Sequence, residues 1–425
     1  MNISQLLIPS LPPACVRQPV VDRSQEVVGY KVLCKGGTGN LLGRIEKNPA
    51  MTVRIDASEL PTAAAPSSAF TYDLQKLTNG KKSFVNFEKP LLIEQAFLSL
   101  DPTTSVVEVT ETDHHDVEFI NACLGVRKAG YTVALNDYVI ESQHQPLLEH
   151  IDMMDIDFPT VTADHHERII ETAMRYGFAP VACEVDTQDD FAKAQEFGYQ
   201  YFRGSYYNKP RRKIANRLLG SHLIYLQLLK AVNASLFQVD DIEQLIRKDV
   251  ALTTQLLRYL NSPAFGLRTR VSSIRHALGV LGHRPLKKWL SLIAVSELSK
   301  ERPLVLMTTS LIRARFCETL GEKLIGPNSV GDCFLVGLLS LLDAILDQPL
   351  GEVVAGLGLS ASIEATLLHQ NSPFNPFLDL IQAIEEGDWR WISALAFQIQ
   401  FNEAQIFAAY EDAIQWASSI TSSTP

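Results

Sequence analysis

The sequence predicts two folds in succession, an α/β barrel of the TIM type and then an all-α bundle. Short apolar runs alternate with longer helical segments from Val16 to Pro210, and such alternation is typical of right-handed crossovers and a parallel sheet. From His222 onward a 3.6-residue period dominates. A chain of 425 residues is also longer than one hydrophobic core usually serves. We therefore expect a barrel domain over residues 1–210 and a helical domain over residues 211–425.

The elements of the barrel follow from this alternation in chain order. The expected strands cover residues 16–21, 26–33, 83–87, 105–110, 131–135, 151–157, 179–185 and 199–202. The expected helices cover residues 90–100, 116–130, 145–151, 167–177 and 189–198. A turn at Asp22-Arg23-Ser24-Gln25 joins the first two strands as a hairpin, and so many repeats of strand and helix indicate closure into a barrel.

The helical domain follows a basic junction, KPRRKIANR. Its cations, with Lys209 and Arg217 at the two ends, have two interpretations: a contact with phosphate or nucleic acid, or a solvated linker. The acidic character of the whole chain favours the linker. Near the end of the chain, Asn402 is placed to cap a last helix, EAQIFAAYEDAIQWA.

Composition excludes several classes of function. A formal net charge of -10 and a pI near 5.5 argue against general affinity for nucleic acid or an anionic membrane. No secretory signal is evident, and the longest apolar stretch, 334–346, is too short to span a bilayer. We therefore expect a cytoplasmic protein with no nucleic-acid or membrane partner. The six cysteines form no CxxC pair, which predicts reduced thiols rather than a zinc site or a disulfide framework.

Polar side chains follow the expected strands at the points where they end. In a barrel of this type the C-terminal ends of the strands carry the reactive groups. The residues concerned are Lys31, Asn86, Glu108, Glu111, Asn136, Asp137, Asp155, Cys183, Asp186 and Arg203. Carboxylate and amide oxygens suit magnesium, manganese or calcium, but strand ends are also polar because they meet solvent. For Asn86, Glu108 and Asp137, on successive strands, both interpretations stay open.

The order of these motifs resembles a known family. RQPVVD, GYKVLCK, VNF, EVTE, LNDY, DMMDID, ACEVDT and RGSYYNKP follow the motifs of EAL domains over most of residues 15–210. EAL domains are barrel phosphodiesterases that hydrolyse the bacterial messenger cyclic di-GMP. The resemblance implies two divalent cations, held by acidic side chains and one asparagine, that activate a water for attack on a phosphodiester.

The sequence departs from the EAL pattern at charged positions. Lys31 stands where the family has the glutamate of its signature tripeptide. Asn136 replaces the first acid of the central Asp-Asp pair, and Asp137 remains. Asn86, Glu108 and Glu111 match the family.

Later motifs depart as well. Asp155 replaces a lysine, and Cys183 replaces a glutamate, with Glu184 in the following glycine position. Asp186 shortens the second acid, and Arg203 replaces a glutamine. Added cations would repel a metal pair by several kcal/mol at an effective dielectric near 20. We therefore predict a vestigial site with no metal, no cofactor and no catalytic residue, in which the lysine of the signature position pairs with Glu108 or with the remaining acid of the central pair.

Residues 215–400 resemble HDOD domains. The order Ile-Arg-Lys-Asp at residues 246–249, Asn261-Ser262-Pro263 and Leu281-Gly282 carries this resemblance. HDOD domains are related to HD phosphohydrolases and characteristically lack the His-Asp metal dipeptide. Here Ser340 and Leu341 occupy the corresponding step.

Two histidine doublets, His114-His115 and His165-His166, follow aspartates at expected helix starts. Adjacent residues of a helix point about 100° apart, which makes a doublet a poor chelate. We predict solvated helix ends rather than metal ligands.

The two resemblances together predict a bacterial EAL–HDOD signalling protein of the YuxH type. The favoured hypothesis is a non-catalytic regulator, acting through protein partners from two-component, motility or biofilm circuits and as a nucleotide sensor. The alternative is an active cyclic di-GMP phosphodiesterase with an altered metal site. A third possibility, nucleic-acid binding through the helical half, rests only on local basic patches. Binding of cyclic di-GMP and oligomer formation are open at this point.

Overall fold

The computed structural model describes the two parts of the chain as separate compact units. One unit comprises Met1–Tyr206 with Ala383–Glu411, and the other comprises Tyr207–Gln382 with Asp412–Pro425. The residues described are 14–35, 74–110, 116–136, 145–211, 220–234, 238–247, 273, 275–276, 282–326 and 329–423. The division at residue 210 into independently folding domains stays a prediction.

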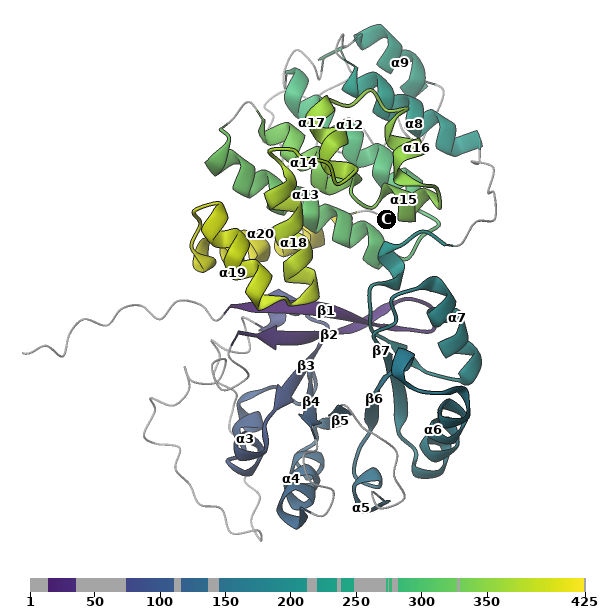
Figure 1. The fold of residues 1–425 in the computed structure, drawn as a ribbon, viewed down its shortest axis with the longest axis vertical. Helices are drawn as coiled ribbons and strands as arrows, with labels where there is room; N and C mark the ends of the chain where they lie inside the picture. Colours follow the sequence, from purple (N-terminus) through teal and green to yellow (C-terminus); the bar gives the residue numbers. More distant parts are fainter. Residues whose placement is uncertain are drawn as a thin grey trace, which may run out of the picture. The chain divides into compact units, whose positions relative to one another are not determined.

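The first unit contains a closed barrel of eight strands in the order β1 to β8 (Figure 1). The strands are β1 (Cys15–Asp22), β2 (Val27–Cys34), β3 (Lys82–Phe87), β4 (Ser105–Thr110), β5 (Thr132–Asn136), β6 (Met153–Asp157), β7 (Ala179–Cys183) and β8 (Tyr201–Phe202). β1 runs antiparallel to both β2 and β8, and the pairs from β2 to β8 are parallel. The predicted barrel and its opening hairpin are confirmed.

Helices and short 3-10 turns connect the parallel strands and lie outside them (Figure 1). They are α3 (Lys89–Ile93), η1 (Ala96–Ser99), α4 (Val117–Lys128), α5 (Gln145–Leu148), η2 (Phe158–Thr160), α6 (Ala163–Tyr176) and α7 (Gln188–Phe197). A further 3-10 turn, η3 (Tyr206–Asn208), follows the last strand. Asp116 caps α4 by accepting from the backbone N–H groups of Glu118 and Phe119, and Thr187 caps α7.

The strand period of two places the core and the polar strand ends on the same inner face. Phe84, Val106, Ala134, Met153 and Val181 form an apolar layer with Val20 and Cys183. Because side chains alternate along a strand, the residue two positions later points the same way. The inner positions above this layer are Asn86, Glu108, Asn136 and Asp155.

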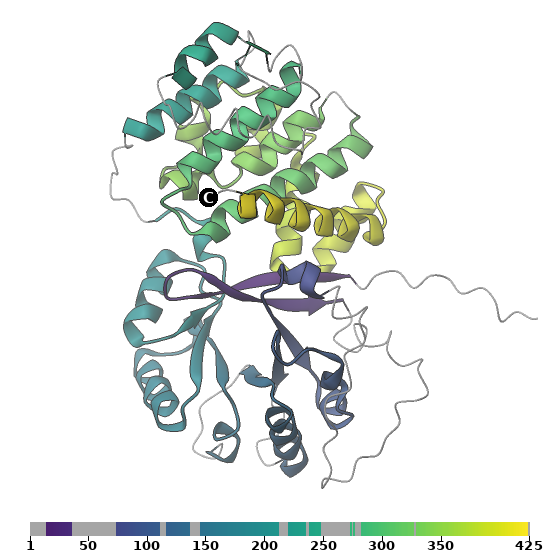
Figure 2. The same ribbon diagram turned by 180° about the vertical axis from the view of Figure 1, so that it is seen from behind.

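The second unit is helical, as predicted (Figure 2). Its helices are α8 (Gly220–Asn233), α9 (Val239–Arg247), α12 (His283–Leu298), α13 (Leu304–Leu324), α14 (Val330–Leu339), α15 (Leu342–Leu346), α16 (Leu350–Val354), α17 (Ala361–Leu367), most of α18 (Asn375–Glu386) and the second half of α20 (Glu403–Ser423). The end of α18, all of α19 (Trp389–Gln398) and the start of α20 belong to the first unit. The predicted cap of α20 is confirmed, since Asn402 Oδ1 accepts from the backbone N–H of Gln405 at 2.9 Å. Of the helices in the described ranges, none is both long and apolar enough to cross a membrane.

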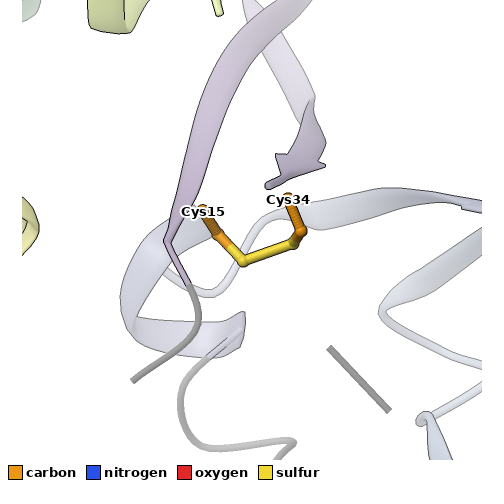
Figure 3. Close-up of a disulfide and its surroundings, with 2 residues drawn as sticks. All are labelled: Cys15 and Cys34. Atoms are coloured by element: carbon orange, nitrogen blue, oxygen red, sulfur yellow. A yellow bond between two sulfur atoms is a disulfide. The ribbon is translucent and has the colours of Figure 1, made fainter. Parts of the chain in front are cut away.

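The prediction of reduced cysteines is wrong for one pair. Cys15 and Cys34 form a disulfide (Figure 3). The other four cysteines are buried and belong to no disulfide: Cys123, Cys183, Cys317 and Cys333. The antiparallel register of β1 and β2 places Cys15 directly opposite Cys34, with a Cα–Cα distance of 4.2 Å.

The prediction for the second histidine doublet is wrong for one residue. His165 is exposed, but His166 is only 3% exposed and its Nδ1 lies 2.8 Å from the Tyr199 hydroxyl. Its ring stacks on Phe158 because the apolar face of α6 turns it toward the barrel. Burial lowers the pKa of His166, so the buried ring is neutral. The first doublet, His114-His115, lies outside the described residues.

Candidate functional site

The predicted strand-end residues separate into a central group and outlying positions. Lys31 from β2, Glu108 from β4, Asp155 from β6 and Arg203 after β8 converge inside the barrel, and we call these four residues the charge cluster. Asn86 and Asn136 lie beside them. Glu111 and Asp137 lie outside the described residues.

Short ion pairs connect the charge cluster. Lys31 Nζ lies 3.1 Å from Glu108 Oε2 and 3.9 Å from Asp155 Oδ2. Arg203 Nη1 lies 2.8 Å from Asp155 Oδ2 and 3.5 Å from Glu108 Oε1. Each carboxylate therefore faces both cations, and the four formal charges sum to zero.

These ion pairs affect the free energy of folding strongly, because their side chains are almost completely removed from water. The Glu108 side chain is fully buried, and those of Lys31 and Arg203 are 14% and 12% exposed. At an effective dielectric near 20, charges 3.1 Å apart attract by about 5 kcal/mol. Removing each ion from water opposes this by several kcal/mol, so the pairs hold only while each ion keeps its partners.

Two neighbouring groups keep fixed protonation states. Burial alone would lower the pKa of the Arg203 guanidinium, but the Asp155 carboxylate and then other nearby groups, including Glu108, raise it above its usual value. Burial holds the pKa of the Cys183 thiol well above its usual range. Arg203 is thus a permanent cation, and Cys183 is a neutral thiol with no thiolate character for metal binding or nucleophilic attack.

The two amides orient toward the charge cluster. Asn136 Nδ2 donates to Asn86 Oδ1 at 3.3 Å and to Glu108 Oε2 at 3.4 Å, and Thr110 Oγ1 also donates to Asn86 Oδ1. Asn136 Oδ1 is buried without a hydrogen-bond partner. An amide at this position supplies donors to Glu108, whereas a carboxylate would repel it.

Asp186 does not join the charge cluster. Its Oδ1 accepts from the backbone N–H of Ser205 at 2.9 Å and from the Ser205 hydroxyl at 2.7 Å. Gly204, which directly precedes Ser205, has a φ of +152°, and a Cβ added to it would lie 2.1 Å from Val185 O. Asp186 therefore fixes the loop after β8 and holds the backbone beside Arg203.

The described residues do not fit a two-metal centre. In the described part of the chain, no group of three or more His, Cys, Asp or Glu side chains is arranged to hold a metal ion. The carboxylate oxygens of Glu108 and Asp155 face an ammonium and a guanidinium instead. A divalent cation placed among them would meet two like charges at contact distance.

The sequence predicted one ion pair of the charge cluster but not the other. Lys31 was expected near an acid, and the structure places it against Glu108. The shortest contact, between Asp155 and Arg203, joins β6 to the loop after β8 and was not expected. Each residue alone had signalled only a departure from the EAL pattern.

Comparison with known proteins supplies the relationship. Residues 221–349 match the HDOD domain. The chain is 29% identical over 409 residues to the uncharacterized protein YuxH of Bacillus subtilis, covering 94% of this chain and 97% of that protein. It is 26% identical over 406 residues to the cyclic di-GMP phosphodiesterase CdgJ of Vibrio cholerae, covering 95% and 92%. The similarity to these two relatives thus runs over nearly the whole chain, and the HDOD match lies in its helical part.

Solved EAL structures also align with the barrel part of this chain. The EAL domain of Mycobacterium smegmatis DcpA is 16% identical with a TM-score of 0.34, covering 45% of this chain and 89% of that one. The manganese and cyclic di-GMP complex of Klebsiella pneumoniae BlrP1 is 19% identical with a TM-score of 0.34, covering 46% and 55%. The barrel fold is established by the eight paired strands themselves.

In the HDOD half, the residue at the His-Asp position is engaged structurally. Ser340 Oγ accepts from Arg313 Nη1 at 3.1 Å and donates to Gly337 O at 2.8 Å. Most of the HDOD motif between residues 248 and 281, including Asn261-Ser262-Pro263, lies outside the described residues.

Proposed function

We propose that this chain is a non-catalytic signalling protein related to cyclic di-GMP phosphodiesterases. The charge cluster is the observation that carries the proposal, because both buried carboxylates already have cationic partners from the chain itself. Lys31 and Arg203 supply the positive charge that metal ions supply in two-metal hydrolysis, but an ammonium and a guanidinium have no open site for water.

The barrel then acts as a rigid scaffold rather than a catalyst. Buried charge pairs that satisfy each other hold the strand ends in one arrangement. We propose that signalling occurs by protein–protein contact, with regulatory partners of the two-component or motility type in the cytoplasm, and that the HDOD half carries the recognition surface. Arg275 on this half is 62% exposed and pairs with Asp240 and Glu243, which makes it a testable surface position.

The alternative is an active phosphodiesterase with an altered site. It is favoured by the relative CdgJ, whose name is that of a cyclic di-GMP phosphodiesterase, and by the presence of Asn86 and Glu108. The positions that separate the two proposals are Lys31, Asn136, Asp155 and Cys183. In the alternative, at least the lysine would have to leave Glu108 before a metal could approach.

A hydrolysis assay separates the proposals. Full-length protein is incubated with cyclic di-GMP and either magnesium or manganese, and the linear dinucleotide is quantified against a no-enzyme control. We expect no product above that control, and none from Lys31→Glu alone, because Asp155, Cys183 and Arg203 remain. Metal-dependent product from the unmodified chain that disappears in Glu108→Ala would establish the alternative.

The recognition proposal has a separate test. Below the melting temperature of each variant, partner capture in a pull-down should persist in Glu108→Ala, although its barrel is destabilised, and should weaken in Arg275→Ala, whose melting temperature should not change. The reverse pattern would place the recognition surface on the barrel.

A further inference from the structure

A C-terminal segment belongs to the barrel unit. Ala383–Glu411, which includes the end of α18, all of α19 and the start of α20, groups with the barrel. Gln18 on β1 lies opposite Lys31 in the hairpin, and its Nε2 donates to the carbonyl oxygens of Glu385 and Glu386 at 3.2 and 3.3 Å. The end of α18 thus docks on the residue that faces the lysine of the charge cluster.

Close packing continues along the hairpin. A Cβ added at Gly387 would lie 2.9 Å from Leu33 Cδ1 and 3.9 Å from Val16 Cγ2. Leu33 and Val16 lie opposite each other, two residues beyond Lys31 and Gln18 on the same face of the two strands. Gly387 also has a φ of +73°, so the helix can end here and approach the hairpin closely only with glycine.

An ionic contact holds the outer end of the hairpin. Lys35 Nζ pairs with Glu403 Oε1 at 2.5 Å and donates to Ser393 Oγ at 3.3 Å. Ser393 in turn donates to Glu403 at 2.9 Å. The hydrogen bond from Lys35 lowers the pKa of Glu403, so the acid stays ionised. These contacts connect α19 and α20 to the residue that follows Cys34.

The disulfide closes the hairpin at the same point. Figure 3 shows the bridge between Cys15 and Cys34. Cys15 directly precedes Val16 and Cys34 directly follows Leu33, the two residues next to Gly387. Both bridged cysteines are only partly buried, whereas the four cysteines outside the bridge are buried. The bridge is therefore the cysteine pair that a dissolved thiol can reach.

We propose that the Cys15–Cys34 disulfide is a redox latch for the docked segment Ala383–Glu411. In the oxidised chain the bridge fixes the ends of β1 and β2, so that Gln18, Leu33 and Lys35 present their contacts together. In the reduced chain the strand ends separate, and the segment is released from the hairpin. In a reducing compartment, a disulfide that solvent can reach more often acts as a redox sensor than as a permanent stabilising bond.

The chemistry is thiol–disulfide exchange with a low-molecular-weight thiol. One thiolate attacks a sulfur of the bridge, forms a mixed disulfide and displaces the other cysteine as a thiolate, which takes a proton. A second thiol attacks the mixed disulfide, leaving two protein thiols and one small-molecule disulfide. Two electrons pass from the two thiols to the bridge, and an oxidised small-molecule disulfide reverses the steps.

Two measurements on the full chain test the latch. Alkylation in denaturant without reductant, followed by mass spectrometry, should modify Cys123, Cys183, Cys317 and Cys333 but neither Cys15 nor Cys34. Hydrogen exchange in peptides covering 385–399 should accelerate about tenfold on addition of dithiothreitol, because local opening sets the exchange rate. Peptides of α6 should not change. Alkylation of all six cysteines, or equal exchange in both redox states, would overturn the proposal.

Variants separate docking from redox chemistry. Cys15→Ser with Cys34→Ser should give the fast exchange rate with and without dithiothreitol. Gly387→Ala should accelerate exchange in both redox states, since its Cβ meets Leu33. Gly177→Ala is the matched control, because Gly177 also ends a helix, α6, at a φ of +81° but has nothing within 4 Å of an added Cβ. Equal hydrogen-exchange rates of residues 385–399 in Gly387→Ala and Gly177→Ala would show that the contact of Gly387 with Leu33 does not hold the segment on the hairpin. Should the double serine variant fail to fold, the response of the unmodified chain to dithiothreitol still decides.

Discussion

Removing one ion from the charge cluster should destabilise the barrel far more than removing a surface ion. Lys31→Met keeps most of the side-chain length but leaves Glu108 and Asp155 with Arg203 as their remaining cation. The lost Lys31–Glu108 contact, at 3.1 Å, corresponds to about 5 kcal/mol at an effective dielectric near 20. Experience with broken buried pairs gives a net loss of about 3–5 kcal/mol.

The charge balance makes a sharper prediction. Glu108→Gln alone leaves two cations facing Asp155 and should also destabilise the barrel by about 3 kcal/mol. The double variant, Lys31→Met with Glu108→Gln, retains the Arg203–Asp155 pair at 2.8 Å and a net charge of zero. Its loss should be smaller than the sum of the single losses by at least about 2 kcal/mol.

Urea-dependent hydrogen exchange of peptides from β4 and β6 measures these free energies in the full chain. Lys89→Met is the matched control, because Lys89 pairs with Asp116 in the same barrel but is 32% exposed. Its loss should be much smaller than that of Lys31→Met, because solvent screens this pair. Additive losses in the double variant, or a Lys31→Met loss no larger than that of Lys89→Met, would refute the reasoning.

Three further predictions concern the rest of the chain. Burial lowers the pKa of His166, so the unfolded chain binds a proton more readily than the folded chain does. The free energy of unfolding of the barrel should therefore be highest above pH 6.5, the usual pKa of histidine, and should decrease as the pH falls below it. In His166→Phe, the urea midpoint should decrease less between about pH 7.5 and about pH 5.5 than in the unmodified chain. Glu318→Gln leaves Lys288 and Arg315 without their shared carboxylate and should lower helical-unit stability by about 3 kcal/mol in urea unfolding; an unchanged midpoint would show the network to be dispensable. A fragment of residues 1–210 lacks the docked segment and should unfold at lower urea than the barrel in the full chain, while residues 216–425 alone should give a cooperative, helical transition in circular dichroism.

The fold could be predicted because local patterns determined it. Alternating runs fixed the strands, and the period of two put Asn86 and Glu108 on the inner face. The Asp155–Arg203 contact could not be predicted, since it depends on how barrel closure brings the end of β6 to the loop after β8. Docking of Gly387 on Leu33 joins residues far apart in the chain and leaves no local signal.

Two features carried a sequence signal that was missed. His166 shares a helical face with Ile169, Ile170 and Ala173, and this spacing indicates burial. Cys15 and Cys34 lie at the outer ends of two strands joined by a short turn, so pairing outward from Asp22 brings them together. The register shift between Val20 and Val21 obscures that count in the sequence.

The central claim is that Lys31 and Arg203 occupy the electrostatic role of metal ions in this barrel. Manganese titration of the full-length protein, followed by electron paramagnetic resonance, tests it directly, because bound and free manganese give different signals. We predict no saturable manganese binding that depends on Glu108, and no difference between the unmodified chain and Glu108→Ala. Saturable binding of two manganese ions per chain that is lost in Glu108→Ala would contradict the account.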